Sequence, residues 1–244
     1  MNSVLNNKIN HFENCESCNF CTARKESIFD CLDEEEIELL KLGQSDLSFK
    51  YGELIFKEKQ IPTGVFIITK GKVKISKLGF AGREQIVRFA KEGDIIGYRA
   101  LLSNEKFTCN AFSISETNVC FLAKDLIFKL IEKNNQLALR FIHLLAVDIR
   151  ISEEKMLHMA QKTVRERVAE AILILKEIYG FESDGNTVNI ILKRDELAGI
   201  AGTVRETATR FLLELNSENV ISVDGKKIKI LNLKKLELCA NPTF

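Results

Sequence analysis

The fold is decided by a stretch near the C-terminal end of the chain, which reads Arg194-Asp-Glu-Leu-Ala-Gly-Ile-Ala-Gly-Thr-Val-Arg-Glu-Thr-Ala-Thr-Arg-Phe-Leu-Leu-Glu-Leu215. Apolar residues between Leu197 and Ala201 give its first half one short helical face. Gly202 breaks that helix, and Thr203 can N-cap a second one, with Glu206 three positions on to complete a capping box. Two short helices around a glycine turn are therefore predicted, and this arrangement is a helix-turn-helix.

The second helix of this pair carries polar residues close to its N-terminus. That end of a recognition helix is the one that enters the major groove of DNA. An arginine can pair with guanine O6 and N7, and a glutamate can accept a hydrogen bond from cytosine N4. Charges on a helix are often only a solvated face, but here the glycine turn, the cap and the polar cluster coincide. We therefore predict that this helix binds DNA through Thr203, Arg205, Glu206, Thr209 and Arg210.

A predicted β-hairpin follows the second helix directly. Val220–Val223 alternates in polarity, Asp224-Gly225 is a hairpin turn signal, and Lys226–Leu231 alternates again. A hairpin straight after a helix-turn-helix is the wing of a winged helix, and its lysines suit contacts with phosphate.

The composition limits the classes of protein that fit. The 244 residues suffice for one large or two small domains, and a formal net charge of +1 argues against binding nucleic acid through bulk positive charge. No apolar run is long enough to span a membrane, and residues 1–20 lack the apolar core of a signal peptide. We expect a cytoplasmic protein whose seven cysteines, an odd number, form no disulfide framework.

Residues 32–124 are predicted to form a sensor domain of short strands, preceded by a cysteine-containing segment over residues 1–31. Strand-like runs alternate with turn glycines and begin at Leu54, Val65, Val73 and Gln85. No helical pattern comes between these strands, so an antiparallel barrel or sandwich is expected.

Residues 125–160 are predicted to form a long helix. Its apolar residues recur every seven positions at Leu130, Leu137, Leu144 and Ile151. This is the spacing of a coiled-coil seam and indicates a dimer interface. Asp148 interrupts the seam, and we expect it to face solvent; the alternative is that it tunes the strength of the dimer. The winged helix belongs to the last domain, residues 161–244.

A strand-rich sensor, a long helix and a winged helix, in this order, resemble the Crp/Fnr family of bacterial transcription regulators. The resemblance covers roughly residues 32–233. Its most specific part is Arg205-Glu206-x-x-x-Arg210, which resembles the base-reading trio of the catabolite-activator branch. Glu206, Thr209 and Arg210 also resemble the Glu-x-x-Ser-Arg of the Fnr branch, with threonine in place of serine.

The resemblance implies an α+β protein. It would have an N-terminal antiparallel, jelly-roll-like β-roll of the cyclic-nucleotide-binding type, a long dimerisation helix and a C-terminal winged helix-turn-helix. The resemblance also implies a homodimer that binds a palindromic operator in double-stranded DNA, with TGTGA- or TTGAT-like half-sites, and that acts on RNA polymerase.

The family's cyclic-nucleotide cassette indicates where an effector would bind. In that cassette a Gly-x-Ile-Gly motif precedes a glutamate for the ribose, and an Arg-Ser pair holds the phosphate. Here Gly93–Gly97 is followed by Tyr98 and Arg99, without a carboxylate. The phosphate positions fall on Thr108 and Cys109, without an arginine, so a cyclic phosphate would lose a charge-assisted pair. A cyclic nucleotide is therefore disfavoured, and the candidate effector pocket is Tyr98, Arg99 and Thr108.

The cysteines indicate a rival signal. In the Fnr branch an N-terminal cysteine group and one later cysteine hold an oxygen-labile [4Fe-4S] cluster, and Cys120 falls where the later cysteine is expected. Cys15 and Cys18 resemble the first two, but the third position lies between Cys21 and Cys31. Four thiolates can bind a cluster or Zn²⁺, and the candidate metal ligands are Cys15, Cys18, Cys21 and Cys120. The alternative is that Cys109 and Cys120 are small core residues and that the N-terminal group binds no metal.

We therefore predict a sequence-specific DNA-binding transcription regulator, controlled allosterically through its β-roll by an unidentified signal that is redox- or oxygen-related rather than a cyclic nucleotide. The alternative is a redox- or metal-handling protein whose winged helix mediates protein contacts. An enzyme is not expected, because the sequence has no Gly-rich phosphate loop, nucleophile–base signature or metal–carboxylate motif.

Overall fold

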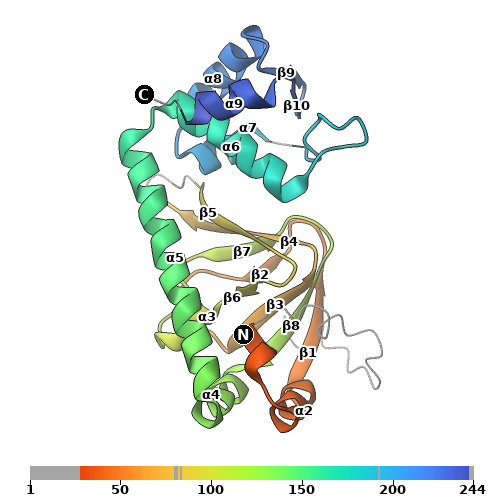
Figure 1. The fold of residues 1–244 in the computed structure, drawn as a ribbon, viewed down its shortest axis with the longest axis vertical. Helices are drawn as coiled ribbons and strands as arrows, with labels where there is room; N and C mark the ends of the chain where they lie inside the picture. The colour runs from red at the N-terminus through yellow and green to blue at the C-terminus, as the bar shows by residue number, and fades with distance from the viewer. Residues whose placement is uncertain (1–27, 80–81, 83, 192, 242–244) are drawn as a thin grey trace. The chain divides into compact units, whose positions relative to one another are not determined.

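The computed structural model describes residues 28–79, 82, 84–191 and 193–241 (Figure 1). The chain divides into two compact units. The first unit contains Met1–Lys77 and Arg88–Ile149, and the second contains Leu78–Val87 and Arg150–Phe244. Both divisions fall inside elements of regular structure, one in a strand pair and one in a long helix, and each unit is described by itself below.

Short strands in two four-stranded sheets form the N-terminal domain. They are β1 (Gln44–Phe49), β2 (Leu54–Phe56), β3 (Gly64–Lys70), β4 (Lys72–Leu78), β5 (Glu84–Lys91), β6 (Ile95–Ile96), β7 (Asn110–Ser113) and β8 (Thr117–Ala123). The sheets have the orders β1-β8-β3-β6 and β2-β7-β4-β5. Strand β8 pairs antiparallel with β1 and β3, and β7 pairs antiparallel with β2 and β4, so the predicted antiparallel β-roll is confirmed.

Strand β3 explains why this domain has two cores. Successive side chains of a strand point to opposite faces. Val65 and Ile67 accordingly belong to a cluster shared with the helices, whereas Phe66 and Ile68 belong to a cluster between the two sheets. The helices of the first cluster are η2 (Ile28–Cys31), α2 (Glu34–Leu42), α3 (Tyr98–Leu102) and α4 (Lys124–Lys133), together with the first half of α5 (Asn135–Gln161).

The single long helix expected from residue 125 onward is instead two helices, α4 and α5, separated at Asn134. The Asn134 side chain explains the break, because its Oδ1 accepts the backbone N–H of Gln136 at 2.9 Å and so caps α5. Its Nδ2 donates to the carbonyl of Cys31 at 3.2 Å and to the carboxylate of Glu36 at 2.8 Å.

The predicted dimer seam is wrong at its first two positions. Leu130 and Leu137 are fully buried in the chain's own core, together with Phe141. A seven-residue repeat identifies an apolar face of a helix, and here that face packs on the β-roll. The large apolar side chains that α5 exposes are at Leu139, Ile142, Ile149, Ile151, Met156 and Leu157.

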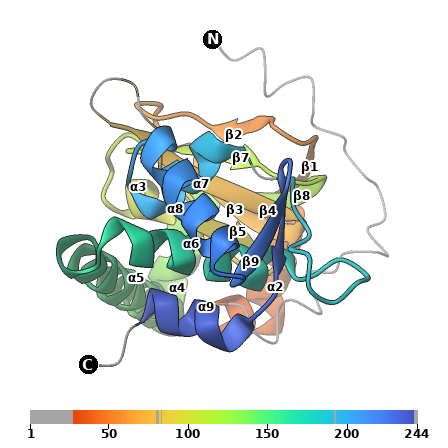
Figure 2. The same cartoon turned by 90° about the horizontal axis from the view of Figure 1, so that it is seen from above.

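Within the second unit, residues 164–240 form a winged helix-turn-helix, as predicted. Its elements are α6 (Val164–Tyr179), α7 (Arg194–Ala201), α8 (Arg205–Ser217), β9 (Ile221–Asp224), β10 (Lys227–Ile230) and α9 (Leu233–Ala240). Helix α6 packs against α7, α8 and α9, and Figure 2 shows it between α8 and α9. Strands β9 and β10 pair antiparallel as the wing.

Among the described residues, none of the helices combines the length and the apolar character that a membrane-spanning segment needs.

Candidate nucleic-acid interface

Gly202 forms the turn between α7 and α8. Its φ of +62° lies in the left-handed region that favours glycine, and its N–H donates to the carbonyl of Ala198 to close α7. A Cβ at Gly202 would also lie 2.5 Å from Cε of Met159. The predicted break at this glycine is therefore confirmed, and it sets the direction in which α8 leaves the turn.

Helix α8 begins one residue later than predicted. Its N-cap is Val204, which makes no side-chain capping bond, and Thr203 lies half-buried in the turn instead. The predicted capping box of Thr203 with Glu206 is therefore wrong. The buried stripe of α8 consists of Ala208, Leu212 and Leu215, and its spacing leaves the opposite face of the helix to solvent.

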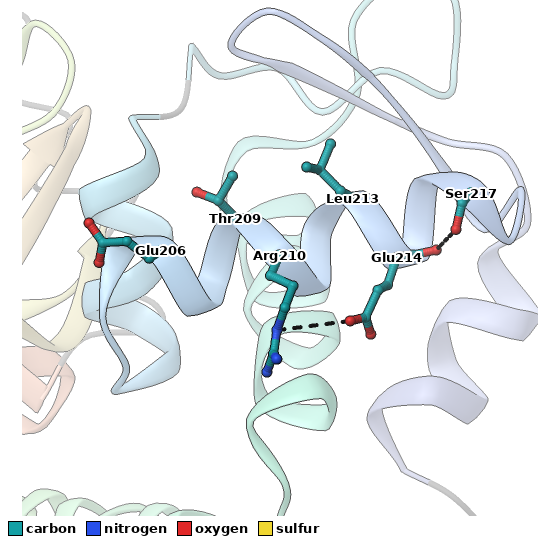
Figure 3. Close-up of a pocket in the computed structure, with 6 residues that line it drawn as sticks. All are labelled: Glu206, Thr209, Arg210, Leu213, Glu214 and Ser217. Atoms are coloured by element: carbon teal, nitrogen blue, oxygen red, sulfur yellow. Dashed lines mark hydrogen bonds and ion pairs between the residues drawn. The ribbon is translucent and has the colours of Figure 1, made fainter.

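The exposed face of α8 carries the predicted base-reading residues, of which Figure 3 draws Glu206 and Arg210. The side chains of Arg205 and Arg210 are 61% and 65% exposed, and Glu206 is exposed. Arg205 lies 3.8 Å from Asp195, and Arg210 lies 3.9 Å from Glu214. Ion pairs of this length on an exposed surface contribute about 1 kcal/mol or less, so both guanidinium groups can exchange these partners for others.

Thr209 lies half-buried on the same helix. Its hydroxyl donates to the carbonyl of Arg205 at 2.8 Å, so its one donor is used within the helix. Figure 3 places Thr209 and Leu213, one turn later, on the same edge of α8, while Arg210 and Glu214 extend to the other side.

The wing presents lysines, two of which have carboxylate partners. Lys227 pairs with Glu182 at 2.8 Å, and Lys229 pairs with Asp184 at 3.1 Å. Lys226 is exposed in the hairpin turn. The guanidinium of Arg194, at the start of α7, donates to the carbonyl of the turn residue Gly225 at 2.7 Å, so the wing is fastened to the helix-turn-helix.

The predicted effector residues lie in the first unit, and two of them meet at Asp148. Arg99 Nε lies 2.7 Å from Asp148 Oδ2, Arg88 lies 3.0 Å from Oδ1, and the hydroxyl of Tyr98 donates to the same carboxylate. Thr108 lies exposed before β7, apart from these hydrogen bonds.

Asp148 is only 5% exposed, so the expectation that it faces solvent is wrong. Asp148 and Arg88 are the two members of this cluster that the sequence pattern did not indicate. The sequence did contain one signal for this cluster, which is an acidic residue within the apolar part of a predicted helix. If such a residue is buried, its carboxylate requires hydrogen-bonding or charged partners. Burial, and then the hydrogen bond to Asp148, raise the pKa of Tyr98 to about 12.

Of the predicted metal ligands, only Cys120 lies within the described residues. It is fully buried on β8, and its thiol donates to Oε1 of Gln44 at 3.4 Å, so it is a core residue in this arrangement. Within the described part of the chain no group of three or more His, Cys, Asp or Glu residues is placed to hold a metal ion. Cys15, Cys18 and Cys21 lie outside the described residues, and their metal binding stays a prediction.

Two family models match the chain. Residues 46–134 match the cyclic nucleotide-binding domain, and residues 166–239 match the Crp-like helix-turn-helix domain. These two ranges contain the β-roll and the winged helix described above.

Known proteins resemble the chain over most of its length. The nitrogen fixation regulation protein FixK of Bradyrhizobium diazoefficiens is 28% identical over 225 residues, covering 91% of this chain and 93% of that protein. The anaerobic regulatory protein of Bacillus subtilis is 25% identical and covers 91% and 93%. A solved structure of a CRP/FNR-family transcriptional regulator from Thermus thermophilus is 26% identical with a TM-score of 0.67, covering 80% of this chain and 97% of that one.

The matched domains, the relatives and the observed winged helix agree on one assignment. The relatives are transcription regulators with a helix-turn-helix DNA-binding domain, and this chain carries both of the family's domains in the same order. The chain belongs to the Crp/Fnr family of transcription regulators.

Proposed function

We propose that a homodimer of this chain binds a palindromic operator in double-stranded DNA and reads each half-site through α8. The observation that carries this proposal is that Arg205, Glu206 and Arg210 are exposed within the first two turns of α8. The ion pairs of the two arginines are long and exposed, so the arginines lose little free energy when they leave these carboxylates to contact base edges.

Each of these side chains has a matching partner in the major groove. The guanidinium groups of Arg205 and Arg210 can each donate two hydrogen bonds to O6 and N7 of a guanine. The carboxylate of Glu206 can accept from N4 of a cytosine. Lys226, exposed in the turn of the wing, suits a phosphate of the adjoining backbone.

A second copy of the chain is proposed to pack on the exposed apolar row of α5. Leu139, Ile142, Ile149 and Met156 are spaced by three and then seven residues, which places them along one side of the helix. Crp/Fnr regulators commonly act as dimers. A two-fold dimer can present two recognition helices about 34 Å apart, the spacing of half-sites one helical turn apart.

The signal is proposed to act on the junction between the β-roll and α5. Asp148 of α5 binds Arg88 of β5 and Arg99 of α3, so a change at this carboxylate alters how the helix is held. Such a change would shift the population between two arrangements of the dimer, only one of which fits the operator.

An oxygen- or redox-related signal fits better than a cyclic nucleotide. A cyclic phosphate at this position would have to displace the carboxylate of Asp148 from Arg99, which it holds at 2.7 Å. The B. subtilis relative is an anaerobic regulatory protein, which supports a signal of the oxygen class. As in the family, the DNA-bound dimer would act on RNA polymerase.

The test begins with the full chain and a randomised duplex pool, from which the operator is selected. Arg205→Ala and Arg210→Ala should each weaken binding to the selected duplex by about 1–3 kcal/mol and relax the base preference at one position. Fluorescence anisotropy against the selected duplex and a random duplex measures both effects.

The matched control is Lys234→Ala, which removes one positive charge from the exposed surface of α9. This variant should bind the selected duplex and the random duplex slightly more weakly than the wild type does, and by the same factor. Equal losses on both duplexes for the α8 variants would contradict base reading. Failure to select any duplex would favour the alternative in which the winged helix contacts proteins.

A further inference from the structure

Leu213 is an apolar side chain on the polar face of α8. Its residue is 56% exposed, and it is the one large apolar side chain of this fully described helix that stands open to solvent. The core-facing stripe of α8 consists of Ala208, Leu212 and Leu215, so Leu213 does not contribute to that core.

The neighbours of Leu213 are the proposed DNA-reading residues. It lines one shallow surface depression with Glu206, Thr209, Arg210, Glu214 and Ser217. Arg210 is drawn away from it, because its guanidinium lies over the ring of Phe211 at 4.6 Å and pairs with Glu214. The leucine side chain is therefore left uncovered on its own edge of the helix (Figure 3).

Thr209 adds apolar surface to this edge, one turn before Leu213. Its hydroxyl donates to the carbonyl of Arg205, so it has no O–H left to donate to a ligand and offers its methyl group, with the hydroxyl oxygen as an acceptor only. An edge formed by a threonine methyl and a leucine side chain recognises apolar groups. In the major groove the apolar group on the base edges is the 5-methyl of thymine.

We propose that Leu213 is a specificity-determining residue that contacts the 5-methyl group of a thymine in the half-site. This inference rests on the proposed placement of α8 in the major groove. Leu213 follows Arg210 by three residues, about 4.5 Å along the helix axis, whereas neighbouring base pairs are about 3.4 Å apart. The thymine is therefore expected within about one base pair of the guanine that Arg210 reads.

The test removes single methyl groups from the DNA. In the operator selected with the full chain, each thymine of the half-site is replaced in turn by deoxyuridine, which lacks only the 5-methyl. At one thymine position, this replacement should weaken binding by about fourfold per half-site, which is the contribution expected from burying one methyl group. In Leu213→Ala that penalty should disappear, and the unmodified operator should bind about as weakly as the deoxyuridine operator binds to the wild type.

Leu238→Ala on α9 is the matched control, because Leu238 is also 56% exposed. It should retain the deoxyuridine penalty in full. Alanine is a strong helix former, so both exposed variants should remain folded, which circular dichroism verifies.

The results separate this inference from the proposed function. The inference is overturned if no thymine is sensitive to loss of its methyl group, or if the penalty persists in Leu213→Ala. It is also overturned if Leu213→Ala weakens random duplex as much as the operator, since that would indicate a contact without base preference. If Arg205→Ala and Arg210→Ala also fail to reduce specific binding, the placement of α8 itself is wrong.

Discussion

Arginine–carboxylate pairs occur in both units of the chain, with opposite consequences. In the first unit, Asp148 of α5 is buried and holds Arg88 and Arg99 at 3.0 and 2.7 Å. On α8, Arg210 and Glu214 are exposed and lie 3.9 Å apart. The comparison teaches that the residue types alone do not indicate a role, because burial and distance decide whether a pair maintains structure or remains open to a ligand.

The largest effect is expected from Asp148→Ala. This change leaves two guanidinium groups and the Tyr98 hydroxyl without their shared acceptor, and breaking a buried ion pair costs about 3–5 kcal/mol. Partial exposure of Arg99 places the expected loss at the lower end of this range. Urea unfolding followed by circular dichroism measures it.

Glu154→Ala is the control for Asp148→Ala, because it removes a carboxylate from the same helix. Glu154 pairs with Arg150, and both side chains are more than half exposed, so the loss should be below about 1 kcal/mol. Equal losses for the two variants would mean that burial does not distinguish these pairs.

A smaller effect is expected from pH at Tyr98. Its pKa is about 12 in the folded protein and about 10 when unfolded, so the unfolded state loses the proton first as pH rises. The stabilisation is complete below pH 10 and is lost between about pH 10 and 12. The stability advantage of the wild type over Tyr98→Phe should therefore shrink by about 1 kcal/mol between pH 10 and 11.

Urea unfolding at pH 8, 10 and 11 checks this prediction. Tyr51→Phe serves as the comparison, because it removes a tyrosine hydroxyl from a residue that is 63% exposed. A stability difference between the wild type and Tyr98→Phe that stays constant from pH 8 to 11 would contradict the prediction.

The smallest effect is expected from Glu214→Gln. Removing this carboxylate releases Arg210 and removes a negative charge from the DNA-facing helix, so affinity for random duplex should rise by about two- to fourfold. The unfolding free energy should change by less than about 0.5 kcal/mol.

Glu237→Gln, which removes an exposed carboxylate from α9, provides the comparison. If it raises DNA affinity as much as Glu214→Gln does, the effect is one of net charge and not of the Arg210 pair.

The parts that could be predicted from the sequence depend on local patterns. The helix-turn-helix follows from Gly202 and the apolar spacing on either side of it, and the wing follows from alternation around Asp224-Gly225. The sequence predicts the start of α8 one residue too early, because Thr203 has a side chain that can cap a helix and Val204 does not. In the structure the turn includes Thr203, and Val204 is the N-cap residue.

The parts that could not be predicted depend on contacts between distant residues. The repeat through Leu130 and Leu137 indicated an apolar face correctly, but spacing does not reveal whether a second chain or the β-roll covers it. The place of Asp148 within an apolar helix indicates that it needs a partner, but the local pattern does not identify Arg88, which lies 60 residues away. Helical spacing places Leu213 on the polar face of α8, away from the buried Leu212, but spacing alone does not show what an exposed leucine contacts.

Asn134 gives the start of α5 an unusual dependence on the chain that precedes the β-roll. One side-chain amide contacts three segments, since it caps α5, donates to the carbonyl of Cys31 in η2 and donates to Glu36 in α2. A displacement of Cys31 would therefore change the hydrogen bonding of Asn134 at the first turn of α5 directly, without a change in the sheets. The hydrogen bonds of Asn134 therefore join η2 and α2 to the first turn of α5 through a single side chain.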